Sequence, residues 1–195
     1  MEIILASASP RRKYLLGVLL SNFGLKFRVE PANIVEFFPE SIRNIPLFVS
    51  KLALEKANVI AAKREAIVIG ADTVVVLGNK ILNKPEHHDE AAEMLHLLSG
   101  KTHRVITAIA VVDKARRRSY KTFESTFVTF RKLTGREINF YVESGSPLDK
   151  AGAYGIQDDF GSTFVKKIDG DYFNVVGLPI VKTYLLLKKV LDLRI

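Results

Sequence analysis

The chain has 195 residues, a length typical of one globular domain, which excludes a fusion of two enzymes. Hydrophobic residues make up 48% and charged residues 26%, so the chain can bury a core, and neither intrinsic disorder nor a coiled coil fits this composition. The formal charge of +8 favours anionic partners, and the absence of cysteine excludes disulfides, thiolate nucleophiles and cysteine-bound metals.

The first part of the chain predicts a strand, a turn and a helix, followed by a second strand and a long helix. Residues 3–6 are a continuous apolar run, and the polar turn 7–10 leads into apolar residues at helical spacing, Leu15, Val18 and Leu19. Residues 27–30 alternate as a half-buried strand does, and 31–39 form a loop. A long amphipathic helix then begins near Pro46.

The middle of the chain predicts a buried strand, a hairpin and a helix. Residues 66–77 are rich in β-branched side chains, and only Asp72 and Thr73 interrupt this apolar run. Gly78-Asn79 is a two-residue hairpin signal, and Asp89 can cap the helix that follows.

The last part predicts a hairpin and further helices. Residues 105–112 and 123–130 are strand-like and flank the basic turn 116–118, while 134–137 form a capping box that opens a helix. Then come a glycine-rich loop over 150–157, a strand over 163–168 and a helix from Pro179 onward. The interleaving of strands and helices predicts an α/β layered fold with a mixed sheet.

No targeting or membrane segment is expected. The first residues have no basic region before an apolar stretch, and no run approaches the ~20 apolar residues of a membrane span. We therefore expect no membrane partner and a cytoplasmic location.

Four residues around the first turn are a candidate anion site. Ser7, Ser9, Arg11 and Arg12 stand where a strand leads into a helix, whose free amides and positive dipole end favour phosphate. An ordinary helix cap with solvated basic residues explains the same pattern, so both interpretations stay open.

Asp72 and Thr73 are the second candidate, because a carboxylate inside a buried strand is costly without partners. A metal ligand or a general base is favoured over a structural polar network. The strand alone does not decide between these two roles.

Three further residues indicate a binding site only when they are considered together with the others. Lys56 on the long helix and Lys84 after the hairpin suit an anionic site, although isolated lysines are usually solvated. Gln157 ends a loop whose glycines allow close backbone approach, and its amide can read the edge of a base.

Several common motifs are absent from the sequence. It has no P-loop, no dinucleotide-binding glycine pattern and no His-Glu-x-x-His zinc motif. The basic clusters at 116–118 and 188–189 lack interleaved aromatic residues, which favours a hairpin tip and a solvated helix face. We therefore expect no nucleic-acid partner.

Seven segments, in order along nearly the whole chain, resemble the Maf family of nucleoside triphosphate pyrophosphatases. They are Ser7–Arg12, Glu55–Ala57, Gly70–Val75, Lys84–Pro85, Leu98–His103, Leu148–Gln157 and Val176–Pro179. The resemblance implies hydrolysis of a nucleoside triphosphate between the α and β phosphates, with a divalent metal, Mg²⁺ or Mn²⁺. It also implies a single Maf-like domain over 1–195, whose mixed twisted sheet is split into two lobes around a deep cleft as in ITPase-like proteins, and a homodimer like those common among relatives.

The same resemblance assigns roles to site residues. Asp72 matches the catalytic proton acceptor, and Glu36 matches a second acidic position, so the two form the implied metal site. The implied phosphate ligands are Lys56, Lys84, Ser7, Arg11 and Arg12. Arg11, Thr73 and Gln157 match the branch of the family that acts on dTTP and UTP, whereas the 7-methyl-GTP branch resembles Gly-x-Asp-Gln at the second motif.

Two other functions remain as alternatives. A nucleotide-binding regulator of cell division would need the same phosphate pocket without turnover. Nucleic-acid binding driven by the charge of +8 would weaken steeply with salt. Both rank below the enzyme.

Overall fold

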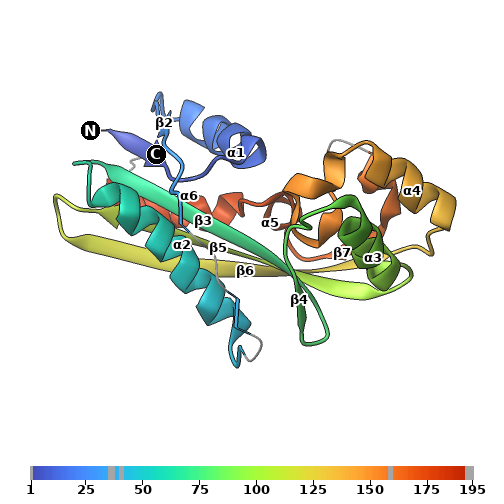
Figure 1. The fold of residues 1–195 in the computed structure, drawn as a ribbon. Coiled ribbons are helices and arrows are strands. Elements are labelled where there is room, and N and C mark those ends of the chain that lie inside the picture. Colours follow the sequence, from blue (N-terminus) through green and yellow to red (C-terminus); the bar gives the residue numbers. More distant parts are fainter. Residues whose placement is uncertain (1, 35–37, 40–41, 158–159, 192–195) are drawn as a thin grey trace. The chain divides into compact units, whose positions relative to one another are not determined.

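The computed structural model describes residues 2–34, 38–39, 42–157 and 160–191 (Figure 1). Its strands are β1 (Ile3–Leu5), β2 (Arg28–Val29), β3 (Ile67–Leu77), β4 (Lys80–Leu82), β5 (Thr102–Asp113), β6 (Arg118–Phe130) and β7 (Val165–Asp169). The α-helices are α1 (Pro10–Ser21), α2 (Ile45–Ala61), α3 (His88–Leu98), α4 (Gly135–Glu143), α5 (Tyr172–Val176) and α6 (Ile180–Leu191). Short 3₁₀ helices are η1 (Ser146–Asp149), η2 (Ala151–Ala153) and η3 (Phe160–Phe164). Within these described ranges, no helix is both long and apolar enough to cross a bilayer.

The strands form a mixed sheet, which confirms the predicted α/β class. In the described ranges the sheet has seven strands, with β2, β1, β3, β5, β6 and β7 as hydrogen-bonded neighbours in that order. β1 pairs in parallel with both β2 and β3, whereas β4 pairs antiparallel with β3, and β7 with β6. The antiparallel β3–β4 pairing confirms the hairpin predicted from Gly78-Asn79.

The chain divides into two compact units. Unit 1 comprises Met1–Asp72, Thr107–Glu124 and Gly177–Ile195, and unit 2 comprises Thr73–Ile106 and Ser125–Val176. Strands β3, β5 and β6 contribute residues to both units, and the division on β3 falls between Asp72 and Thr73. The single domain over 1–195 and the deep cleft stay predictions.

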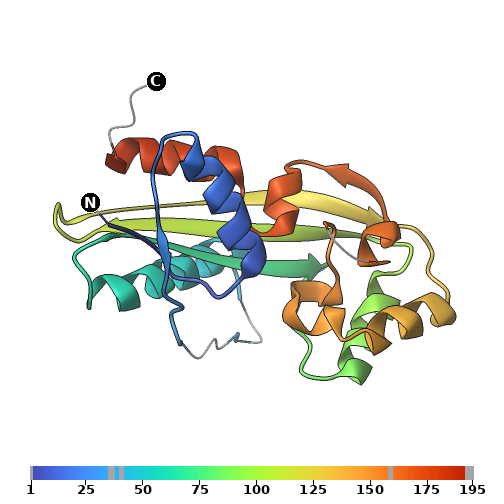
Figure 2. The same ribbon diagram turned by 90° about the horizontal axis from the view of Figure 1, so that it is seen from above.

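Unit 1 has helices on both faces of its part of the sheet. α2 lies on one face, and α6 lies on the other with α1 beside it (Figures 1 and 2). Phe23 and Tyr184 stack with their ring centroids 6.0 Å apart, which links the end of α1 to α6. Leu15 and Leu19 of α1 are buried as their spacing predicts, whereas Val18, predicted in the same pattern, is 45% exposed.

Unit 2 packs α3 and α4 against its own apolar core. Phe130, Tyr141, Tyr154 and Phe164 form edge-to-face ring pairs within that core, a geometry that aromatic quadrupoles favour. This aromatic cluster holds the segment around Tyr154, where the predicted loop over 150–157 lies.

Two helix caps test the sequence signals directly. Thr134 and Glu137 form the predicted capping box, with Glu137 N–H donating to Thr134 Oγ1 at 3.3 Å and Thr134 N–H donating to Glu137 Oε2 at 2.7 Å. The Asp89 cap is wrong, because α3 begins one residue earlier, at His88. The ring of His87 accepts from Glu90 N–H at 3.3 Å and is the cap instead.

Candidate functional site

Asp72 and Lys56 form a buried ion pair in unit 1. Asp72 lies on β3 and Lys56 on α2, and Lys56 Nζ donates to Asp72 Oδ1 at 2.5 Å. Only 4% of Asp72 and 8% of Lys56 is exposed. Each charge offsets part of the cost of desolvating the other. Two residues predicted separately from the sequence therefore meet at one place.

Close packing of α2 against β3 brings this pair together. Gly70 lies two residues before Asp72, so both positions face the same side of the strand. A Cβ atom at Gly70 would stand 2.2 Å from the Ala53 carbonyl oxygen and 2.8 Å from the Ala57 nitrogen. The absence of a side chain at Gly70 lets the helix approach, and Lys56 then reaches Asp72.

The turn before α1 has the predicted strand–turn–helix form. Ser9 is the N-cap, and its hydroxyl oxygen accepts from Arg12 N–H at 3.4 Å. Ser7 Oγ accepts from Ser9 N–H at 3.3 Å, and Arg11 is half-buried at the second position of the helix. The positive dipole end of a helix of this length favours an anion such as a phosphate group at this turn.

Arg12 links this turn to the neighbourhood of Asp72. Its Nη1 donates to Ser7 Oγ at 3.2 Å and to the Ala71 carbonyl oxygen at 2.9 Å, and its Nε donates to the Gly177 carbonyl oxygen at 2.9 Å. The guanidinium thereby holds the turn beside the residue that precedes Asp72. Its predicted contact with phosphate stays a prediction.

Thr73 belongs to unit 2 and faces away from the ion pair. As the residue after Asp72 on a strand it points to the opposite face of the sheet, the face of Val75. Gly152 packs on that face, because a Cβ atom built there would stand 2.9 Å from Val75 Cγ2. Its φ of +69° is one that glycine adopts without strain. The loop over 150–157 thus lies on the Thr73 side of β3.

Lys84 and Gln157 also belong to unit 2, and both are exposed. Gly152 N–H donates to the Asn83 carbonyl oxygen at 3.0 Å, which places the segment before Lys84 against the start of the Gln157 loop. The structure therefore brings the Lys84 and Gln157 segments together. The contacts of these two side chains with substrate stay predictions.

The predicted metal site can be tested only in part. Glu36 lies outside the described residues. Within the described ranges, no group of three or more Asp, Glu, His or Cys side chains could hold a metal ion. The Asp72 carboxylate is a hard oxygen donor, and Mg²⁺ is commonly held by one or two carboxylates together with substrate phosphates and water. These residues fit a cation shared with substrate rather than a cage made by protein alone.

His103 is a buried residue to which the sequence analysis gave no individual role. It lies on β5, is 2% exposed, and its Nε2 is 2.8 Å from the Tyr154 hydroxyl oxygen. The signal was present, because His103 stands two residues before the apolar Val105 and so faces the core on the same strand. The contact with Tyr154 fixes the start of the Gly155–Gln157 segment.

Burial of His103 predicts a dependence of stability on pH. Burial lowers the pKa of His103 from 6.5 to about 4, so between these values the unfolded chain binds a proton that the folded chain does not. We expect the free energy of unfolding to fall by about 3 kcal/mol as the pH falls through this interval. Denaturant unfolding across the interval measures the slope. His103→Gln should lose the part of the pH dependence that comes from His103, whereas His96→Gln, at an exposed position, should retain it. A wild-type slope in His103→Gln would contradict the assignment.

Comparisons with known proteins find relatives along the full chain. A family model described as Maf-like protein matches residues 2–190. A dTTP/UTP pyrophosphatase of Alkaliphilus oremlandii is 47% identical over 196 residues, covering 100% of this chain and 98% of the relative. A dTTP/UTP pyrophosphatase of Bacillus pumilus is 49% identical over 185 residues, covering 93% of each. Among solved structures, a nucleoside-triphosphatase / dITP/XTP pyrophosphatase from Mycobacterium abscessus covers 98% of this chain and 96% of its own, with 12% identity and a TM-score of 0.49.

Proposed function

The chain belongs to the Maf-like protein family, and on that premise we propose that it hydrolyses dTTP and UTP to the monophosphate and pyrophosphate. Relatives that share 47% and 49% of their residues with it carry the name dTTP/UTP pyrophosphatase. The observation that carries the proposal is the buried Asp72–Lys56 pair, since it combines a carboxylate and an ammonium where the family motifs converge.

Asp72 is the general base of the proposed reaction. A water molecule attacks the α-phosphorus, its oxygen forms the new bond to phosphorus, and the bond from phosphorus to the bridging oxygen breaks. The proton of the water passes to the Asp72 carboxylate, and pyrophosphate leaves with the bridging oxygen. Lys56 Nζ, in contact with Asp72 Oδ1, orients the carboxylate and carries a positive charge close to the reacting phosphate.

The turn before α1 binds phosphate oxygens in this proposal. Ser7 donates through its hydroxyl, the positive dipole end of α1 favours the anion, and Arg11 adds a guanidinium beside them. Arg12 donates to the Ala71 and Gly177 carbonyl oxygens and so fixes the position of this turn relative to Asp72. Charge on the leaving pyrophosphate is thereby stabilised by groups that need no rearrangement.

A divalent cation, Mg²⁺ or Mn²⁺, is part of the proposal, with Asp72 and Glu36 as the residues that would hold it. When bound, such a cation neutralises phosphate charge and withdraws electrons from the phosphorus. Asp72 meets its preference for hard oxygen ligands.

Thr73, Gln157 and Arg11 select the base in the proposal, and Lys84 adds a phosphate contact. The amide of Gln157 offers one donor and one acceptor, which can match the acceptor and donor on the edge of uracil or thymine. The cytoplasmic location and the homodimer also remain predictions.

Release of pyrophosphate from a panel of nucleoside triphosphates tests the function. We expect dTTP and UTP to be hydrolysed well ahead of ATP, GTP, CTP and 7-methyl-GTP, with Mg²⁺ or Mn²⁺ present. Preference for 7-methyl-GTP would retain the reaction but contradict the roles of Thr73 and Gln157. Tight binding of dTTP without turnover would contradict the enzyme and favour the regulator of cell division.

A further inference from the structure

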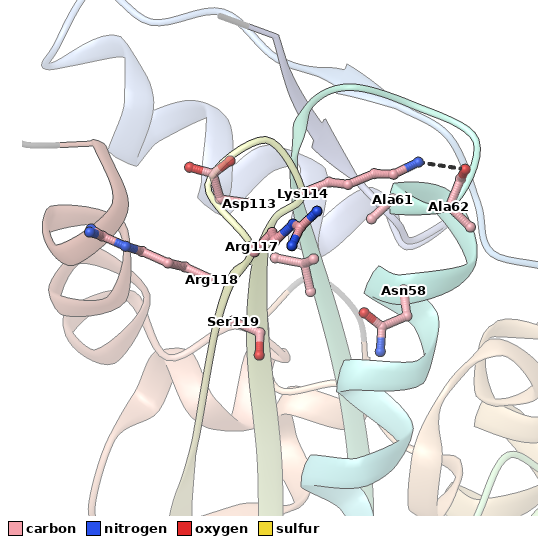
Figure 3. Close-up of a pocket in the computed structure, with 9 residues that line it drawn as sticks. Asn58, Ala61, Ala62, Asp113, Lys114, Arg117, Arg118 and Ser119 are labelled. Atoms are coloured by element: carbon pink, nitrogen blue, oxygen red, sulfur yellow. Dashed lines mark hydrogen bonds between the residues drawn. The ribbon is translucent and has the colours of Figure 1, made fainter.

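The tip of the β5–β6 hairpin and the end of α2 border an open surface cavity in unit 1. Its volume is about 390 Å³, within the range of small-molecule sites. Figure 3 shows the hairpin residues on one side, and on the other Asn58 and Ala61 of α2 with Ala62 directly after the helix. Asn58 follows Lys56 by two residues on α2, a rotation of roughly 200° about the helix axis, so the cavity lies on a different side of the helix from the Asp72–Lys56 pair.

The hairpin side of the cavity carries a positive charge. Lys114, Arg117 and Arg118 line it, and all three are exposed. Asp113 is the acidic residue among the lining residues, and it is held by Arg116, whose backbone N–H and Nη1 donate to its two carboxylate oxygens at 3.1 and 3.0 Å. The carboxylate is thus neutralised locally, and the cations of Lys114 and Arg117 dominate the field in the cavity.

The backbone conformation of Arg117 determines where its side chain begins. Arg117 N–H donates to the Lys114 carbonyl oxygen at 3.1 Å, which closes a turn, and Arg117 has a φ of +50°. Glycine or asparagine adopts this conformation with least strain in hairpin turns, whereas arginine does not. The turn holds Arg117 in this conformation and so fixes the point from which its guanidinium extends.

Side-chain directions complete the site. Lys114 reaches across to α2, where its Nζ donates to the Ala62 carbonyl oxygen at 2.9 Å, and Arg117 is drawn between the hairpin and α2 (Figure 3). Arg118 extends away from α2 (Figure 3). Asn58 offers an amide and Ser119 a hydroxyl on the walls, so charged and neutral donors converge on the same space.

We propose that this cavity is a second binding site of the protein, for a phosphate-bearing small molecule of nucleotide size. Arg117 and Lys114 hold the phosphate, because a guanidinium fork and an ammonium are the side chains that bind it best. Asn58 faces the remainder of the ligand. The site is independent of the chemistry at Asp72, so failure of one proposal leaves the other standing.

Arg117→Gly is the sharpest variant, because it removes the guanidinium and places at φ +50° the residue that adopts this conformation most easily. Its thermal unfolding should be unchanged or higher, and its hydrolysis of nucleotides unchanged. Binding is followed by ¹H–¹⁵N NMR, from the Asn58 side-chain amide and the Ser119 backbone amide, during titration with inorganic phosphate and with AMP. Arg136→Gln, an exposed arginine on α4, is the control for loss of one positive charge.

We expect both signals to move on titration, with an apparent affinity at least ten-fold weaker in Arg117→Gly and unchanged in Arg136→Gln. AMP binding at least ten-fold tighter than phosphate would identify a nucleotide, and equal affinities would identify a free phosphate group; both support the site. Signals that stay still with both compounds, or that move equally in wild type and Arg117→Gly, would overturn it.

Discussion

Asp72→Asn is expected to lower pyrophosphate release by roughly 10²- to 10⁴-fold, the contribution typical of a general base. The asparagine amide has the size of the carboxylate but cannot take the proton of the attacking water. Nucleotide binding should persist, because the turn before α1 does not depend on that proton. Turnover and nucleotide affinity, measured on the same preparation, give the result.

The same substitution also changes stability, which must be separated from the loss of chemistry. Asp72→Asn leaves the Lys56 ammonium buried beside a neutral group, and breaking a buried pair costs about 3 kcal/mol or more. Replacing both partners, as in Asp72→Asn with Lys56→Met, should recover most of that stability and none of the activity. Glu2→Gln breaks an exposed ion pair of 2.8 Å with Arg28 and should change little. Full turnover in a folded Asp72→Asn protein would refute Asp72 as the base.

Gly70→Ala is expected to destabilise the protein by about 3 kcal/mol or more, the upper range for overpacking a core. The new methyl group would lie 2.2 Å from the Ala53 carbonyl oxygen, and neither that atom nor the Ala57 nitrogen at 2.8 Å belongs to a side chain that can rotate away. α2 must move outward, and Lys56 then separates from Asp72, so activity falls together with stability. The denaturation midpoint and the turnover number report the two effects.

Gly135→Ala is the matched control for that substitution. Gly135 opens α4, and a Cβ atom there would meet nothing within 4 Å. Alanine is the better helix former, so this variant should be as stable as wild type or up to about 1 kcal/mol more stable. A Gly70→Ala protein with the stability of Gly135→Ala would show that α2 does not pack on β3 as described.

The strands and helices with a strong local signal were predictable. The apolar run 66–77, the turn Gly78-Asn79 and the box Thr134–Glu137 each carry their signal within a few neighbouring residues of the sequence. The Asp89 cap was wrong because the ring of His87, two residues earlier, accepts from Glu90 N–H, so Asp89 lies inside the helix. The five-residue helix α5 has too few turns for a periodic signal, and it was not predicted.

Some features of the candidate site were likewise predictable from the sequence, and others were not. Ser7, Arg11 and Arg12 could be located from a strand–turn–helix pattern, and Asp72 from a carboxylate within an apolar run. The sequence could not show that Arg12 donates to the Ala71 and Gly177 carbonyl oxygens, because those atoms come from distant segments. The same holds for His103, whose neutral form depends on burial by the aromatic cluster of unit 2.

The sequence by itself therefore determined the α/β class, the Maf family through seven motifs in order, and the residue types available for phosphate chemistry. Only the tertiary structure decided that Lys56 contacts Asp72 across a separation of 16 residues, and that Thr73 turns to the other face of β3 from Asp72. It also decided that the basic turn 114–118 borders a cavity. Local patterns depend on neighbouring residues, whereas burial and contact depend on how α2 and the sheet pack, and that packing brings together atoms far apart in the chain.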